Sequence, residues 1–180
     1  MGRSTFRSLN FLHAISGRTR DDSGMDITRP WEFVADNVMG GVSSGHIKTL
    51  NIKGRIGTRL TGDVSFENNG GVLQMAFDIN DDGSTFNASG FDGVEIDVLG
   101  NDESYDLRLR TSELTRPWQS YRTSFFATTH WTTVRIPFAN FKAHKTDICF
   151  KSSLLRRIGV LAIGRVFAAD ISVSRFRLIK

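Results

Sequence analysis

One stretch decides the fold class of this chain: Trp31-Glu32-Phe33-Val34-Ala35-Asp36-Asn37-Val38-Met39-Gly40-Gly41-Val42-Ser43-Ser44-Gly45. Its adjacent glycines, Gly40 and Gly41, allow backbone conformations that residues with a Cβ avoid, so they suit a tight bend or a close packing contact. The residues that follow, His46 to Ile52, alternate between polar and apolar side chains as a β-strand does. The stretch therefore predicts a bend that leads into a strand.

The rest of the chain from residue 31 on shows the same period of two, which is typical of strands with one buried face. Turn sequences rich in Asn, Asp and Gly separate the segments, and only Ser152–Arg157 has the character of a short helix. This pattern predicts an all-β jelly-roll sandwich of about nine or ten strands, with at most a short helix. The alternating segments are Leu73–Phe77, Val94–Val98, Tyr105–Leu109, Tyr121–Phe125, Trp131–Ile136, Ile158–Val160 and Ile171–Leu178.

A chain of 180 residues is most simply one domain. Residues 1–24 contain four arginines before the first acid, a composition that resembles a mitochondrial transit peptide or a bacterial N-terminal extension. We therefore expect a disordered or processed segment over 1–24 and a sandwich domain over 25–180. The chain has no apolar run of the ~18 to 20 residues that a membrane span needs, and its single cysteine, Cys149, is expected in the core.

Charge is distributed unevenly along the chain. Residues 61–106 contain eleven acids and no Lys or Arg, whereas residues 142–180 contain nine bases against two acids. Because distant strands interleave in a sandwich, these blocks either neutralise each other or form an acidic and a basic patch that steer a partner or anionic lipid. No recognition helix, zinc finger or aromatic RNA-binding signature accompanies the bases, so nucleic acid is not an expected partner.

The sequence Gly41–Gly45 matches the G-x-S-x-G motif of serine hydrolases. That motif places its serine on a turn from a strand into a helix, whereas a strand is predicted here. Ser43 is therefore expected to be a turn residue. A phosphate-binding reading of the glycines fails for the same reason, because it needs a helix N-terminus. We predict that the chain is not an enzyme and has no catalytic residues.

No metal or cofactor is predicted. The four histidines (His13, His46, His130 and His144) lack the paired spacing of a metal site. Calcium ligands are available in the turn Asp78–Asp82, but that turn lacks the EF-hand spacing, so its acids are expected to be solvated.

Two arginines and two aromatic residues are the candidates for a binding face. Arg108 and Arg110 lie on the side of a predicted strand opposite Leu107 and Leu109, and Trp118 and Tyr121 follow in the next turn and strand. Two guanidinium groups near an aromatic ring suit a carboxylate, a sugar or a peptide. The alternative is that the arginines pair with Glu95 or Asp97 on a neighbouring strand.

Five motifs in order resemble those of the complex I intermediate-associated protein family. They begin with Trp31 and Asp36–Ser43 and end with Trp131–Phe141; between them come Asn68–Val72, Phe91–Val94 and Tyr105–Arg110. After Phe141 the chain reads Lys142-Ala143-His144-Lys145, which departs from the Pro- and Gly-containing loop expected of the family.

The resemblance implies a galactose-binding-like jelly roll, related to carbohydrate-binding modules, without catalysis. It implies an assembly factor for NADH:ubiquinone oxidoreductase that binds membrane-arm intermediates, working in the bacterial cytoplasm, peripheral to the membrane, or on the mitochondrial matrix side. The alternative is a module that recognises a glycan or another small polar ligand. The motif residues expected to shape loops are Trp31, Asp36, Gly40, Gly41, Ser43, Asn69, Gly70, Gly71, Asp92 and Gly93.

Overall fold

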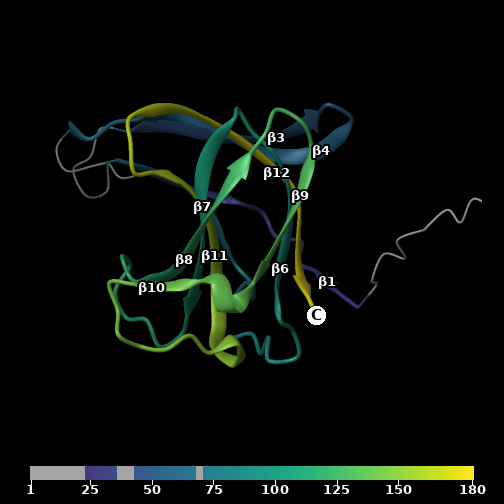
Figure 1. Ribbon diagram of the computed structural model, residues 1–180, viewed down its shortest axis with the longest axis vertical. Coiled ribbons are helices and arrows are strands. Elements are labelled where there is room, and N and C mark those ends of the chain that lie inside the picture. Colours follow the sequence, from purple (N-terminus) through teal and green to yellow (C-terminus); the bar gives the residue numbers. More distant parts are fainter. Residues whose placement is uncertain (1–22, 36–42, 68–70) are drawn as a thin grey trace, which may run out of the picture.

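The computed structural model describes residues 23–35, 43–67 and 71–180, which form two antiparallel β-sheets stacked face to face (Figure 1). These residues contain twelve strands and two short 3-10 helices, η3 (Phe138–Asn140) and η4 (Ser152–Leu154). The predicted all-β sandwich is confirmed. No helix in the described ranges has the length and apolar character needed to cross a membrane.

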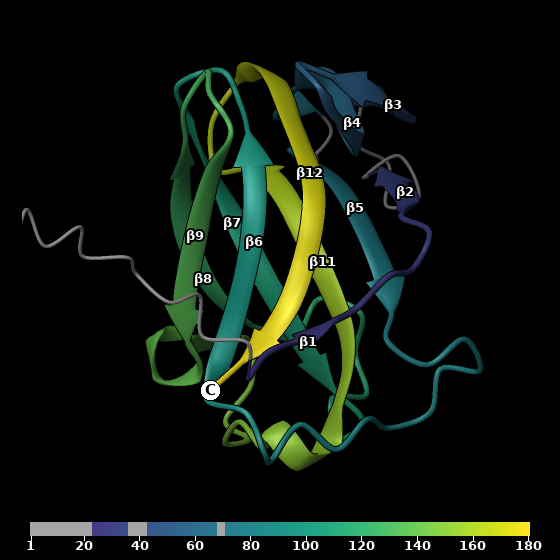
Figure 2. The ribbon, with the colours of Figure 1, turned by 90° about the vertical axis from the view of Figure 1, so that its right-hand side faces the viewer.

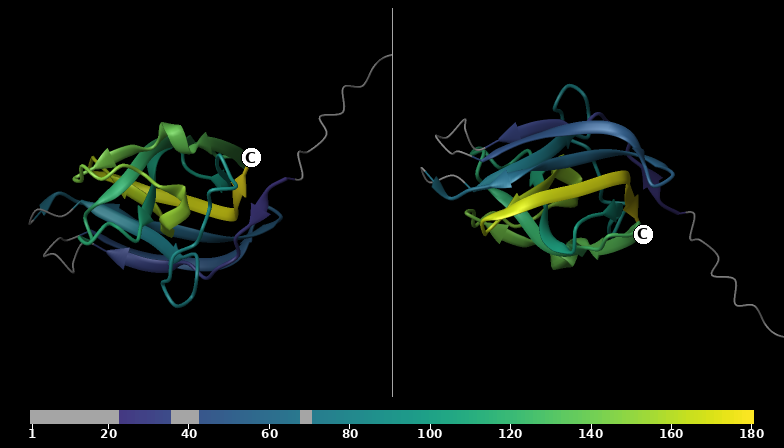
Figure 3. Two further views of the ribbon diagram at one scale, coloured as in Figure 1. Left: turned by 90° about the horizontal axis from the view of Figure 1, so that it is seen from below. Right: turned by 90° about the horizontal axis from the view of Figure 1, so that it is seen from above.

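Sheet A forms the layer that faces the viewer in Figure 2. A short strand, β1 (Met25–Asp26), pairs with β12 near its C-terminal end. Figure 3 shows the β3–β4 hairpin, in blue, running beside β12, in yellow. The main strands in spatial order are β3 (Ser44–Ile52), β4 (Arg55–Val64), β12 (Phe167–Ile179), β6 (Gly93–Leu99) and β9 (Thr132–Pro137).

Sheet B forms the second layer, and its central strand pairs are antiparallel over six or seven residues. Its strands in spatial order are β10 (Lys142–His144), β8 (Ser120–Ala127), β7 (Glu103–Thr111), β11 (Leu155–Ile163), β5 (Val72–Asp78) and β2 (Glu32–Ala35).

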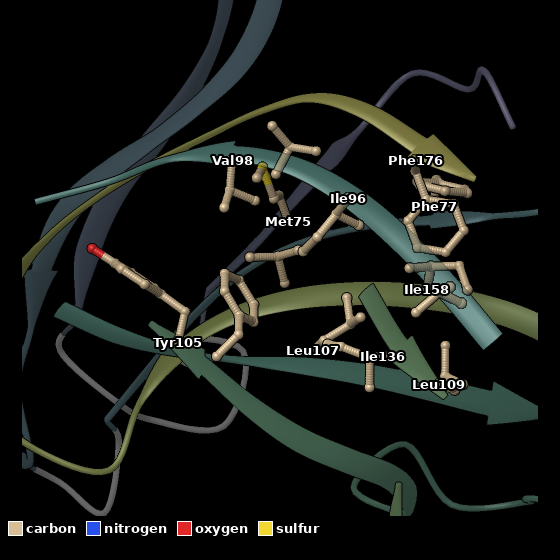
Figure 4. Close-up of a cluster of buried hydrophobic side chains, with 14 of the residues drawn as sticks. Met75, Phe77, Ile96, Val98, Tyr105, Leu107, Leu109, Ile136, Ile158 and Phe176 are labelled. Carbon is tan, nitrogen blue, oxygen red and sulfur yellow. The ribbon is translucent and has the colours of Figure 1, made fainter. Parts of the chain in front are cut away.

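The core lies between the two sheets (Figure 4). Ile96 and Val98 of sheet A and Leu107 and Leu109 of sheet B are completely buried there. Because side chains alternate along a strand, the residues between them point away from the core. The apolar halves of the alternating patterns thus form the core, and the polar halves form the two outer faces.

The described residues form twelve strands where the sequence predicted about nine or ten, and three further details differ from the prediction. Strand β4 was not predicted, because Thr58 and Gly62 interrupt the alternation of its apolar residues. The predicted helix over Ser152–Arg157 is reduced to η4, and β11 begins at Leu155. The prediction of a buried Cys149 is wrong, since this side chain is exposed.

A candidate binding face on sheet B

Three cations stand side by side on the outer face of sheet B. Lys142 of β10 is the cross-strand partner of Arg122 of β8, and Arg122 is in turn the partner of Arg108 of β7. Directly opposed residues in antiparallel strands point to the same face, with Cβ atoms about 4.5–5.5 Å apart. Like charges in that arrangement destabilise a sheet. We call Lys142, Arg122 and Arg108 the cationic row.

One carboxylate lies among these cations. Asp106, two residues before Arg108 on β7, accepts a hydrogen bond of 2.8 Å from the Ser124 hydroxyl. Its other oxygen is 3.6 Å from Arg108 Nη2 and 3.9 Å from Arg122 Nη1. These separations are longer than those of charge-assisted hydrogen bonds. Asp106 therefore offsets only part of the positive charge of the row.

Arg108 is the deepest member of the row, with 13% of its side chain exposed. Its Nε and Nη2 atoms are buried and have no hydrogen-bond partner. Burial lowers the pKa of Arg108, an effect that Asp106 opposes, but a guanidinium remains protonated at neutral pH. A buried donor left without an acceptor costs about 1–3 kcal/mol. This position is therefore unfavourable in the isolated chain.

His144 reports the same local excess of positive charge. It lies on β10 opposite Ser120, on the face that carries Arg122. Burial lowers the pKa of His144, and the positive charges of Arg122, Arg108 and Lys145 lower it further. Protonation of this imidazole is therefore opposed by the surrounding cations.

A surface hollow of about 720 Å³ opens beside the cationic row. Arg122 and Lys142 line it together with Asp106, and Arg165, from the turn after β11, lines it as well. A volume of this size is within the range of ligand sites in proteins. The hollow thus gives a ligand access to Arg122 and Lys142, two of the three members of the row.

Arg110, which the sequence placed on the same face as Arg108, is held by hydrogen bonds to the backbone of the chain itself. Its guanidinium donates hydrogen bonds to the carbonyl oxygens of Gln119 at 3.1 Å, Leu114 at 3.3 Å and Arg116 at 3.0 Å. Arg110 therefore ties the β7–β8 loop to the sheet. Trp118 lies on this loop with 45% of its surface exposed.

Tyr121 does not lie on the binding face, and this part of the prediction is wrong. Tyr121 is the cross-strand partner of Leu109, so it points into the core with Leu109. It is 1% exposed, and its hydroxyl donates a hydrogen bond of 2.9 Å to the Ile148 carbonyl. The residue beside Arg108 is Arg122, one position further along.

Arg122 and Lys142 are the members of the row that sequence reasoning missed. The alternation over Tyr121–Phe125 does show that Arg122 points opposite to Tyr121. It does not show which residue of β7 lies opposite, because that depends on the register. The signal for Lys142 was its place in Lys142–Lys145, where the chain departs from the family pattern.

The alternative pairing of Arg108 or Arg110 with Glu95 or Asp97 is also wrong. Glu95 and Asp97 belong to β6, in the other sheet. Glu95 lies between Arg135 and Arg177, and Asp97 is 3.6 Å from Arg55.

Of the predicted loop-shaping residues, Asp36, Gly40, Gly41, Asn69 and Gly70 lie outside the described residues. Trp31 packs edge-on against Phe77, with ring centroids 4.7 Å apart. Gly71 has a φ of +132°, which strains residues with a side chain.

Two further motif residues, Asp92 and Gly93, lie where β6 begins. The Asp92 amide donates to the Ile179 carbonyl at 2.7 Å. A Cβ on Gly93 would lie 2.5 Å from the Ile136 carbonyl oxygen, so glycine lets β9 approach β6 closely.

Ser43 is a buried residue that bonds to the backbone of a neighbouring segment. Its hydroxyl donates to the Ser65 carbonyl at 3.3 Å and accepts from the Ser65 amide at 3.1 Å. Strand β3 begins at Ser44, directly after it. The predicted strand after the G-x-S-x-G match is thus confirmed, and Ser43 is not at a strand-to-helix turn.

The acids at the end of β5 and in the turn after it each contact a different residue. Asp78 is 3.0 Å from Arg157, Asp81 is 3.3 Å from Arg29, and Asp82 accepts from the Ser84 amide at 3.0 Å. The described part of the chain holds no group of three or more His, Cys, Asp or Glu side chains arranged for a metal ion.

A second hollow, of about 650 Å³, lies in sheet A where β4 stops pairing with β12 after Val173. Trp31, Phe77 and Phe176 line it on the side of the core, and Arg55 and Asp97 line it as well. Its arginines include Arg55, 3.6 Å from Asp97, and Arg175, 3.1 Å from Asp26, so each of these two has an acid of its own.

Solved structures with the same architecture include carbohydrate-binding modules. A family 11 carbohydrate-binding module of a Clostridium thermocellum cellulase superposes with a TM-score of 0.68 at 13% identity, covering 84% of this chain and 88% of that one. A family 30 module of another C. thermocellum cellulase gives a TM-score of 0.59 at 15% identity, covering 87% and 97%. At such identities the likeness shows the fold alone.

The comparison with curated proteins found no match. The family comparison did find one, over residues 19–177, which is most of the chain. The model that matches is described as complex I intermediate-associated protein 30 (CIA30), and the chain therefore belongs to this family.

Proposed function

We propose that this chain is a non-catalytic module that binds a protein partner during assembly of respiratory NADH:ubiquinone oxidoreductase, or complex I. The match to the CIA30 family over residues 19–177 carries the proposal. The outer face of sheet B supports it, because the exposed cations Arg122 and Lys142 lie side by side and line a hollow that is open to a partner.

The proposed partner is an intermediate of the membrane arm of complex I. The module would act at the membrane surface, on the cytoplasmic side in a bacterium or on the matrix side in a mitochondrion. The proposal assigns no bond-making step to the chain, in line with the backbone contacts of Ser43.

Affinity purification from native membranes tests this function. Full-length tagged chain is expected to recover membrane-arm subunits of complex I, identified by mass spectrometry. The matched control is a tagged family 11 carbohydrate-binding module, which has the same architecture. Recovery of complex I subunits at no more than the control level would overturn the proposal.

A second candidate is a carbohydrate-binding module, which the similarity to the family 11 and family 30 modules favours. One solved family 11 module is in complex with a β-1,3-1,4-mixed-linked tetrasaccharide. Sugar rings stack on exposed aromatic side chains, and in the described part of the chain these are Phe66, Trp118 and Phe126.

An NMR titration with the same tetrasaccharide separates the two functions. A carbohydrate-binding module would show saturable shifts, and Trp118→Ala or Phe126→Ala would abolish them. Spectra unchanged at millimolar sugar would reject this second function for mixed-linked glucan.

A further inference from the structure

We infer that the cationic row formed by Lys142, Arg122 and Arg108 binds an acidic segment of the partner protein, whose carboxylates pair with the guanidinium and ammonium groups. This inference rests on the proposed function, since it names the chemistry by which the protein partner is recognised.

The first support is the charge count on the face. Three cations are consecutive cross-strand partners, and Asp106 is the acid in contact with two of them. On sheet A the distances are similar, 3.4 Å for Arg135–Glu95 and 3.6 Å for Arg55–Asp97, but more acids are present, since Asp26 and Asp170 pair with further arginines. A ligand that supplies carboxylates would add negative charge to a face of sheet B on which two of the three cations share Asp106.

The second support is the hydrogen-bond inventory. Arg108 Nε and Nη2 are buried without a hydrogen-bond partner, and Nη2 lies 3.6 Å from Asp106, so Arg122 and Lys142 are the members of the row that a partner can reach. A guanidinium presents parallel N–H groups that match the two oxygens of a carboxylate. The Arg122 side chain is 45% exposed, so it offers such a pair at the surface.

The third support is the character of the adjoining surface. The row continues from Arg108 to Gly159 of β11, and the Gln74 side chain occupies the space that a side chain on Gly159 would need. On the same face, Leu161 lies opposite Asp106 and is 2% exposed. Beside the cations the surface thus offers the uncharged Gln74 amide, which can hydrogen-bond to a polypeptide backbone, while the buried Leu161 offers no apolar contact.

Binding of a defined probe tests the inference. The probe is a fluorescent twelve-residue peptide of alternating Glu and Ser, compared with the same peptide in which Gln replaces Glu. Anisotropy is expected to show saturable, salt-sensitive binding of the Glu peptide to the full chain and none of the Gln peptide. Arg122→Glu and Lys142→Glu are each expected to weaken this binding by about tenfold or more.

The matched control is Lys48→Glu, the same charge change on the exposed side of β3 in sheet A. It is expected to bind the Glu peptide as the wild type does. Equal weakening by Lys48→Glu and Lys142→Glu would show that net charge alone attracts the peptide, and would overturn the inference. The inference would also be overturned if the chain bound phosphatidylglycerol vesicles but not the Glu peptide, and if Lys142→Glu or Arg122→Glu weakened that vesicle binding.

Affinity purification distinguishes this inference from the proposed function. Loss of complex I subunits with Lys142→Glu but not with Lys48→Glu would support both. Equal recovery with both variants would overturn the inference and leave the function standing. Row-dependent peptide binding without any complex I subunits would overturn the proposed function and retain the acidic-segment site.

Discussion

The outer faces of the two sheets both carry several arginines, yet they distribute their acids differently. On sheet A, Glu95 lies 3.4 Å from Arg135 and 3.8 Å from Arg177, and Asp26 lies 2.7 Å from Arg177. Arg59 forms a two-pronged pair with Asp170 at 2.8 and 2.6 Å. Acid and base alternate across the strands there.

On sheet B the cationic row places three like charges in consecutive cross-strand positions, and Arg108 and Arg122 share Asp106 at 3.6 and 3.9 Å. The two faces are made of similar residues, and register decides whether their charges cancel. A neutralised face contributes to the stability of the chain, whereas a face with more cations than acids is suited to an anionic partner.

The largest expected effect comes from placing three cations in consecutive cross-strand positions on sheet A, as they are on sheet B. Glu95→Lys places a cation between Arg135 and Arg177 at a position that is 8% exposed. We expect a loss of about 3–5 kcal/mol in the free energy of unfolding, measured with urea, because a buried charge loses its partners. The control Arg135→Gln, at a half-exposed arginine, is expected to lose less than ~1 kcal/mol. Similar losses for both would break the comparison.

The second effect concerns Tyr105, which reaches from sheet B to the edge of the sheet A face. Its hydroxyl accepts from the Asp170 amide at 2.9 Å, and burial raises its pKa to about 12. The unfolded tyrosine ionises near pH 10, so the folded chain holds the proton longer and stability falls as the pH rises from 10 to 12. The expected contribution is roughly 2–3 kcal/mol.

Tyr105→Phe is the control for this alkaline loss. It lowers stability at pH 8, because the hydroxyl also donates to Asn101 Oδ1 at 2.5 Å, but its urea midpoint should fall less than that of the wild type between pH 10 and 12. If the urea midpoints of the two proteins fell equally between pH 10 and 12, the alkaline loss of stability would not come from Tyr105.

The third effect has the opposite sign. Lys142→Glu replaces a like-charge neighbour of Arg122 with an opposite charge. The free energy of unfolding is expected to rise by about 0.5 kcal/mol. Lys48→Glu, beside Arg59, should gain less, because Asp170 already neutralises Arg59. A lower stability of Lys142→Glu would contradict the view that the row is unfavourable in the isolated chain.

The smallest effect is the pH dependence of His144. Its pKa is lowered in the folded state by burial and by the neighbouring cations, so the unfolded state binds the proton more readily. The stability that neutral His144 contributes is present above its unfolded pKa, near 6.5, and is lost as the pH falls through the lower folded value. His144→Gln should therefore lose less stability between pH 7 and 5, measured by thermal unfolding, than the wild type. If the stability of His144→Gln and of the wild type fell equally between pH 7 and 5, the cationic row would not oppose the protonation of His144.

Both sequence-based alternatives for the charge blocks describe part of the molecule. Residues 61–106 and 142–180 are joined by pairs such as Asp78–Arg157, Glu95–Arg177 and Glu103–Arg165, as expected if the blocks neutralise each other. Lys142, from the basic block, lies instead beside Arg122, from neither block. The row thus combines cations that are far apart in the chain and belong to no common charge block.

The sequence alone determined the fold class, the faces of individual strands and the family, because these depend on local order. The alternation over Tyr105–Leu109 was enough to place Arg108 opposite Leu107. The tertiary structure decided which side chains meet. Tyr121 joined the core and Arg122 joined Arg108 because one residue of register exchanges the faces of a strand, and register depends on pairing between segments that are distant in the chain.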